Sequence, residues 1–206
     1  MDLKVLFTRH GESEANVHRI ISNRNLPHKL TAVCISQALA LAEILRKWNV
    51  KRVIASPIVR AQETGHLIAA ELGVPLSVSS ALREFDCGRM EGRSDDAAWS
   101  AHATVTSAWD EDQDYDCHIR PDGESYHDLQ TRFLPFLKSI IAGKGRQSDI
   151  LLVSHGGLLH QMLPLVLANV DRKFTKSHPL GNCELVVTEP QNTNLVCTEW
   201  AGIELK

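Results

Sequence analysis

The sequence contains no long apolar run, no cysteine pair at a metal-type or redox-type spacing, and no excess of positive charge. Its 206 residues include 22 Lys and Arg and 25 Asp and Glu, a net charge of −3, which argues against a nucleic-acid-binding protein. Apolar stretches such as 158–168 are far shorter than the ~20 residues that a membrane span needs. We therefore expect neither nucleic acid nor a membrane among the partners of this chain.

The cysteines are five, scattered and odd in number. Such cysteines are more often small buried hydrophobic residues in a reducing compartment than disulfide partners. The N-terminus enters a strand-like run at once and has no basic region followed by a cleavable apolar stretch. These features predict a cytoplasmic protein.

The composition, 43% hydrophobic and 23% charged, is typical of a globular protein. We expect one domain over residues 1–206, with a lid insertion at about 85–122, where strong periodicity is missing. Apolar runs predict strands at 3–8, 52–55, 75–78 and 149–153 and a terminal pair at 183–188 and 195–200 around a turn at 190–194. Helices are predicted from about Ser13, from the N-cap Thr31 to Trp48, at 56–72, at 123–141, and after Gly157 with a kink at Pro164.

Alternating strands and helices predict an α/β fold, a three-layer αβα sandwich with a mostly parallel central sheet. Ligands of such sheets bind beyond the carboxyl ends of the strands. Two predicted strands end in a histidine followed by a glycine, at His10 and at His155, so both histidines should meet at one edge. The acidic run at 110–116 is predicted to be a solvated face of the lid, or else a site that repels polyanions or receives a cationic group.

Four short motifs follow predicted strands in this order. They read T-R-H-G-E-S-E-A-N from Thr8, A-S-P-I-V-R-A-Q-E-T from Ala55, L-R-E-F-D-C-G-R-M-E-G from Leu82 and V-S-H-G-G from Val153. A lone histidine after a strand is more often structural, but the four motifs together, in this order, resemble the phosphoglycerate-mutase-like histidine phosphatase superfamily. The resemblance covers nearly the whole chain.

The resemblance implies a role for each matching residue. His10 would be the nucleophile that becomes phosphorylated, and Glu84 the proton donor to the leaving oxygen. The groups that would bind the phosphoryl group or face the substrate are Arg9, Asn16, Ser22, Arg60 and His155. It implies no cofactor and a small phosphorylated metabolite as substrate.

The chemistry of these residue types agrees with those roles. A neutral imidazole has a free lone pair, and a phosphohistidine divides one difficult transfer into two easier ones. Two guanidiniums match the oxygens of a phosphoryl group. Glu84 must be protonated to act as an acid; burial would raise its pKa and the arginines would lower it. No metal is required. His155 and His160 lie five residues apart, so they do not share one face of a helix as metal ligands at positions i and i+4 would.

The phosphatase branch of the superfamily fits better than the mutases. The stretch from Glu84 to Gly92 resembles E-x-x-x-G-x-x-E-G of that branch, and residues 121–125 resemble P-G-G-E-S with Asp122 in place of a glycine. Cys34 stands where members of the superfamily commonly have the glycine of an L-T-x-x-G pattern. The chain has no Arg-Arg pair, which mutases of this group carry. A phosphatase is therefore expected; a phosphoglycerate-type mutase and a non-catalytic phosphate-binding scaffold are the alternatives.

The loop after the first motif is cationic, since 15–42 contains no Asp or Glu but has Arg19, Arg24 and Lys29. It is either an electropositive rim that favours an anionic substrate or a solvated loop. An exposed strand at the edge of the sheet would also permit a homodimer.

Overall fold

The fold is that of a computed structural model, which describes residues 3–24, 26–142, 148–191 and 194–205. Within these ranges, no helix combines the length and the apolar character required to cross a bilayer. Part of the turn predicted at 190–194 lies outside the described residues.

One seven-stranded sheet forms the middle of the molecule, in the order β3-β2-β4-β1-β5-β6-β7. Its strands are β1 Val5–Arg9, β2 Val50–Ala55, β3 Leu76–Val78, β4 Asp149–Ser154, β5 Leu185–Gln191, β6 Asn194–Trp200 and β7 Ile203–Glu204. The strands β3, β2, β4 and β1 are parallel to one another, and β5 joins β1 in the antiparallel direction. The parallel part carries both histidine motifs.

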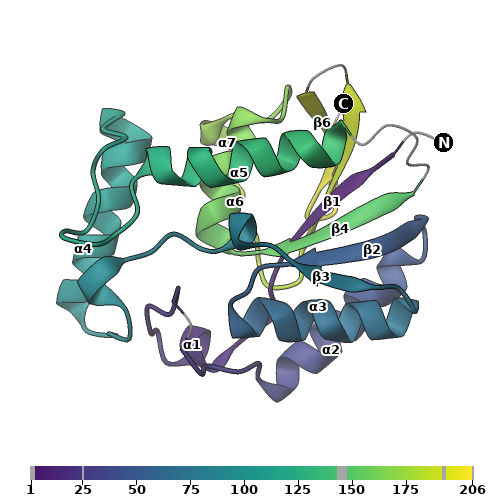
Figure 1. The fold of residues 1–206 in the computed structure, drawn as a ribbon, viewed down its shortest axis with the longest axis horizontal. Coiled ribbons are helices and arrows are strands. Elements are labelled where there is room, and N and C mark those ends of the chain that lie inside the picture. Colours follow the sequence, from purple (N-terminus) through teal and green to yellow (C-terminus); the bar gives the residue numbers. More distant parts are fainter. Residues whose placement is uncertain (1–2, 25, 143–147, 192–193, 206) are drawn as a thin grey trace.

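Helices cover both faces of this sheet (Figure 1). The helices α2 (Ala32–Leu45) and α3 (Val59–Leu72) pack on one face, and α5 (Tyr126–Ile141) and α6 (Gly156–Met162) on the other. Because side chains alternate along a strand, Leu6 contributes to the first core and Phe7 to the second. The predicted three-layer αβα sandwich is confirmed.

Some predicted helix ends agree with the structure, whereas α2 ends at Leu45 rather than Trp48 and α3 begins at Val59 rather than Ser56. Thr31 is the N-cap of α2, and α3 ends before Gly73, whose φ of 66° suits a glycine. The helix after Ser13 is shorter than expected, since α1 spans only Glu14–Val17. Pro164 does not kink a longer helix: α6 ends at Met162, and a 3₁₀ turn at Leu163–Leu165 follows because proline lacks the N–H that a helix needs.

The segment predicted as a lid contains the helix α4 (Asp96–Ser107) and a π-helical turn at Ala108–Asp112. The acidic run is not a solvated face where it begins. Asp110 has a side chain only 16% exposed, lies 3.3 Å from His160 Nε2 and 3.7 Å from Arg172 Nη1, and accepts from the amide of Gln161 (2.9 Å). These partners on α6 and α7 (Arg172–Ser177) attach the end of the lid segment to the main body.

Candidate functional site

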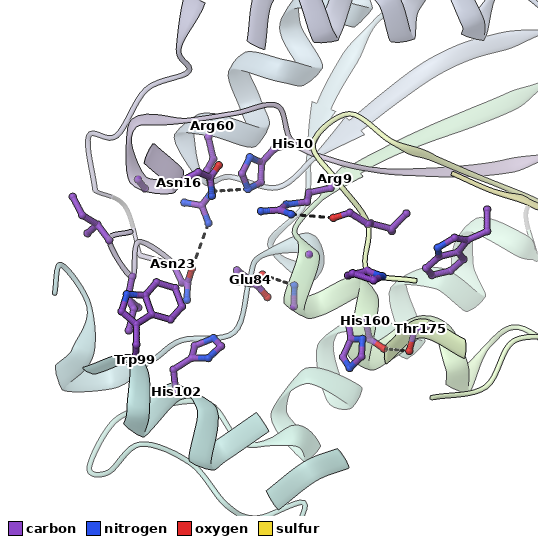
Figure 2. Close-up of a pocket in the computed structure, with 18 residues that line it drawn as sticks. Arg9, His10, Asn16, Asn23, Arg60, Glu84, Trp99, His102, His160 and Thr175 are labelled. Atoms are coloured by element: carbon purple, nitrogen blue, oxygen red, sulfur yellow. Dashed lines mark hydrogen bonds between the residues drawn. The ribbon is translucent and has the colours of Figure 1, made fainter. Parts of the chain in front are cut away.

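The two histidines meet where β1 and β4 end. Arg9 pairs with Ser154 in the parallel register of these strands, and the His10 amide donates to the Ser154 carbonyl (2.9 Å). The rings of His10 and His155 are therefore neighbours, with centroids 5.1 Å apart. Figure 2 shows His10, Arg9, Arg60 and Glu84 around one cavity of about 290 Å³.

His10 is held as a neutral ring with a defined tautomer. Its Nδ1 lies 2.7 Å from the carbonyl oxygen of Gly11, which only accepts, so Nδ1 carries the proton and donates. Burial, reinforced by the charges of Arg60 and Arg9, holds the pKa of His10 well below its usual range. The lone pair therefore lies on Nε2, where it accepts a hydrogen bond from Arg60 Nε, and that bond must be released before Nε2 can attack phosphorus. Gly11 is needed here because an added Cβ would lie 1.9 Å from Cys34 Sγ.

Arg60, in the first turn of α3, faces the nucleophile. Its Nε donates to His10 Nε2 (2.8 Å), while Nη1 donates to the Ser22 carbonyl and Nη2 to Asn23 Oδ1 (3.3 Å). Burial lowers the pKa of Arg60 to about 10, so the guanidinium stays charged near neutral pH. Two of its five N–H donors remain for a phosphoryl group.

His155 is fully buried behind His10. Its Nε2 lies 2.8 Å from the hydroxyl of Ser56, which accepts from the amide of Ile58 (3.2 Å). This arrangement suits a neutral ring that accepts at Nε2 and carries its proton on Nδ1, and burial lowers the pKa of His155 well below its usual range. Nδ1 is a buried atom without a hydrogen-bond partner among the described residues. A phosphoryl oxygen is the kind of acceptor that would satisfy it.

Glu84 approaches the site from the other side. The amide of Gly157 donates to its Oε2 (2.8 Å) and the amide of Phe85 to its Oε1 (3.1 Å). In the described part of the chain Glu84 forms no ion pair; Arg83, its neighbour in sequence, pairs with Glu124. The carboxyl group is therefore positioned by backbone N–H groups and lines the cavity.

Arg9 and Asn16 also line the cavity. Arg9 Nη1 donates to the Leu180 carbonyl (2.9 Å), and its buried Nε has no protein partner within the described ranges. Asn16 Oδ1 accepts from the amide and the hydroxyl of Ser13 (3.1 and 3.0 Å), which leaves Nδ2 as the group that can donate to a bound oxyanion.

The side chain of Ser22, like that of His155, is not part of the cavity lining. It is 2% exposed, and its hydroxyl is paired with His28 Nδ1 (2.8 Å). Its contribution comes through the backbone carbonyl that accepts from Arg60. The neighbouring Asn23 lines the cavity instead, so the prediction for Ser22 is corrected to a role in holding Arg60.

The outer wall of the cavity comes from residues that the motifs did not indicate. Trp99 and His102, on α4, lie on one side of it, and His160 and Thr175 on another (Figure 2). The ring of His102 lies tilted against that of Trp99, with centroids 5.2 Å apart, and burial lowers the pKa of His102. Their spacing of three residues, which places them on one helix face, was the only signal in the sequence.

The cationic loop is less electropositive than its sequence suggests. Arg24 forms ion pairs with Asp86 (2.8 Å) and Asp122 (2.7 Å), acids that lie outside the loop. Arg19 lies over the ring of Trp99, 5.9 Å from its centroid. Among the described residues no three His, Cys, Asp or Glu side chains are grouped as a metal ion would require.

Comparisons with known proteins identify the family of this chain. The family model of the histidine phosphatase superfamily (branch 1) matches residues 5–202. A probable phosphoglycerate mutase GpmB of Proteus mirabilis (strain HI4320) is 32% identical over 204 residues, 96% of this chain and 90% of that protein. A putative phosphoserine phosphatase 2 of Hydrogenobacter thermophilus (strain DSM 6534 / IAM 12695 / TK-6) is 31% identical over 79% of this chain and 78% of its own length.

The fold is also that of a solved structure. The mycobacterial glucosyl-3-phosphoglycerate phosphatase Rv2419c in complex with VO3 superposes with a TM-score of 0.81 at 24% identity, over 98% of this chain and all of that one. This likeness supports the architecture of the sheet and its helices.

Proposed function

Because the chain belongs to the histidine phosphatase superfamily, we propose that it hydrolyses a small phosphomonoester through a phosphohistidine on His10. The observation that carries the proposal is the state of the His10 ring. Its Nδ1 proton is held by Gly11, and its Nε2 faces the Arg60 guanidinium at 2.8 Å. A nucleophile thus lies directly beside a cation suited to phosphoryl oxygens.

In the first step, His10 Nε2 attacks phosphorus while the bond from phosphorus to the ester oxygen breaks. Glu84 gives its proton to that oxygen, so the alcohol leaves neutral. The charge on the three equatorial oxygens is stabilised by Arg9, Arg60 and the Nδ1–H of His155. Arg60 Nε must release His10 Nε2 as the substrate binds, because it donates to that atom in the free site.

In the second step, water attacks the phosphohistidine and the bond from nitrogen to phosphorus breaks. Glu84, now a carboxylate, takes a proton from that water. The products are inorganic phosphate, neutral His10 and a protonated Glu84, which restores the starting state. The amides of Gly157 and Phe85 that hold Glu84 support its use in both steps from one position.

The charges around the cavity favour a hydrolase over a mutase. A phosphoglycerate carries a carboxylate besides its phosphoryl group, and a cation in the outer wall would bind it. In the described lining, that wall offers Trp99, His102 and His160 rather than Lys or Arg. Burial favours the neutral form of His102, and His160 faces Asp110. The wall therefore suits an ester whose leaving group is uncharged.

The proposal is tested by phosphate release from a panel of phosphomonoesters with a chelator present. Wild type is compared with His10→Ala and, as the matched control, with His66→Ala, an exposed histidine on α3. We expect release by wild type and His66→Ala, and none by His10→Ala. Quenching during turnover with alkaline detergent should trap an acid-labile, alkali-stable phosphoenzyme only where His10 is present.

Equal release by wild type and His10→Ala would exclude a phosphohistidine on this residue. Transfer of labelled phosphate between two phosphoglycerates, without release of inorganic phosphate, would support a mutase instead. That outcome would agree with the mutase name of the Proteus relative.

A further inference from the structure

The carboxylate of Glu91, the second glutamate of the motif from Glu84 to Gly92, has no part in the steps above. It faces three backbone N–H groups. Oε2 accepts from the amides of Asn23 (2.7 Å) and Arg24 (3.2 Å), and Oε1 accepts from the amide of Cys87 (3.0 Å). Burial raises the pKa of Glu91, although these amides lower it. The hydrogen bonds of this carboxylate are therefore with backbone amides, two of which belong to the neighbouring residues Asn23 and Arg24.

That stretch is the loop that receives Arg60. The Ser22 carbonyl accepts from one terminal nitrogen of Arg60. Figure 2 shows the other bonds of this guanidinium, to Asn23 Oδ1 and to His10. The loop therefore fixes the plane of the guanidinium, and with it the direction of the donors left for the phosphoryl group. The negative charge of Glu91 also raises the pKa of Arg60, against the effect of burial.

Among the described residues, the other backbone attachments of this loop lie at Ile21. Its backbone pairs with the segment beyond Glu91, through Ile21 and Arg93 (2.8 Å) and through Gly92 and Ile21 (2.7 Å). The side chain of Arg24 leads outward, to Asp86 and Asp122. The backbone N–H of Asn23 donates to Glu91 Oε2 (2.7 Å). This hydrogen bond is shorter than the contact of the Asn23 side chain with Cys87 Sγ (3.4 Å).

We propose that Glu91 is a positioning residue that binds the backbone of Asn23 and Arg24 and thereby aims Arg60 at the phosphoryl group bound beside His10. The inference rests on the proposed function for the identity of the group that Arg60 meets. It assigns a role to an acid of the motif that takes no part in proton transfer. Glu91 would affect the reaction only through the orientation of Arg60.

The test compares Glu91→Gln with Asp149→Asn. Glutamine replaces one acceptor oxygen by a donor, so it cannot accept from both sides of its site. Asp149 is the matched control: it is a buried carboxylate, whereas Glu91 is half-buried, and it also accepts from backbone amides, those of Lys4 (2.8 Å) and Asn49 (2.9 Å), but it begins β4, whose other end carries the site. Both variants should lose stability; only Glu91→Gln should change the site.

Two measurements need no turnover: the affinity for inorganic phosphate by titration calorimetry, and hydrogen exchange of the Asn23 and Arg24 amides. In Glu91→Gln we expect faster exchange at both amides and about a tenfold weaker affinity for phosphate, as for the loss of one charged hydrogen bond. Asp149→Asn should keep wild-type values for both. Folded Glu91→Gln with wild-type phosphate affinity would overturn the inference.

If Glu91→Gln does not fold, Glu91→Asp replaces it, because a side chain one methylene shorter cannot reach both sides of the site. Faster exchange with weaker phosphate binding would support the inference, and faster exchange with unchanged binding would overturn it. A failure of the proposed function appears separately. In that case wild type binds phosphate but releases none from any ester, and the effect of Glu91 on binding is still measurable.

Discussion

Replacing Gly157 by alanine should reduce catalysis without harming the fold. An added Cβ would lie 2.8 and 2.9 Å from the two carboxylate oxygens of Glu84, and ordinary contact begins at about 3.4 Å. The carboxylate must therefore retreat by about 0.6 Å, which is easy for the end of a side chain. A displacement of about 1 Å at a reacting group can reduce a rate by 10²-fold. We therefore expect about a tenfold loss in kcat for esters with poor leaving groups.

Gly156→Ala is the control for this substitution, because both glycines lie in the first turn of α6. At Gly156 the added Cβ would lie 3.4 Å from Arg9 Nε, an ordinary contact. Alanine is a better helix former than glycine by about 1 kcal/mol, so neither variant should lower the free energy of unfolding. The assay measures release from an alkyl phosphate and from an aryl phosphate, alongside urea unfolding. Equal alkyl phosphatase rates for Gly157→Ala and wild type would refute the role of Glu84 as proton donor.

Three further predictions concern the buried histidines and the lid. Since burial keeps the pKa of His10 and His155 well below 6.5, the unfolded chain takes up protons first as the pH falls. As the pH falls below 6.5, each ring should reduce the free energy of unfolding by at most about 1.4 kcal/mol per pH unit. The free energy measured by urea unfolding should therefore depend less steeply on pH for His10→Ala than for wild type. Ser56→Ala removes the partner of His155 Nε2 and should weaken phosphate binding, by about tenfold in calorimetry; unchanged binding would argue against the assigned tautomer. Asp110→Ala removes its contacts with His160, Gln161 and Arg172 but leaves the Glu111–Lys176 ion pair, so KM should rise more than kcat falls, and equal changes would contradict a role of this segment in shaping the outer wall.

The centre of the site was predictable because it depends on sheet topology. Apolar runs that end in His-Gly identify strands, and parallel neighbours bring their carboxyl ends to one edge. His10 and His155 meet for this reason, and their position follows from the register of Arg9 with Ser154. The motif that contains Arg60 likewise predicts this residue at the start of a helix that follows a strand, and therefore at the same edge as the two histidines.

The outer wall was not predictable, because its contacts join segments without a periodic pattern. The helix α4 buries only Ala98 and Val105, so its amphipathic signal is weak and Trp99 and His102 stayed unnoticed. Asp110 is surrounded by acids in the sequence, and its partners on α6 and α7 are distant along the chain. The side-chain directions of Ser22 and Asn23 are likewise fixed by tertiary contacts, with His28 and with Arg60.

The place of β4 between β1 and β2 also determines when the site can exist during synthesis. The strands that lead to His10 and to the start of α3 are made early, yet they are not neighbours in the sheet. Each must wait for β4, which begins only at Asp149, and until then both present an unpaired edge. A chain cut short before that strand would hold the nucleophile and its cation on separate pieces of backbone. Activity is therefore expected only after β4 has been synthesised and has paired with both β1 and β2.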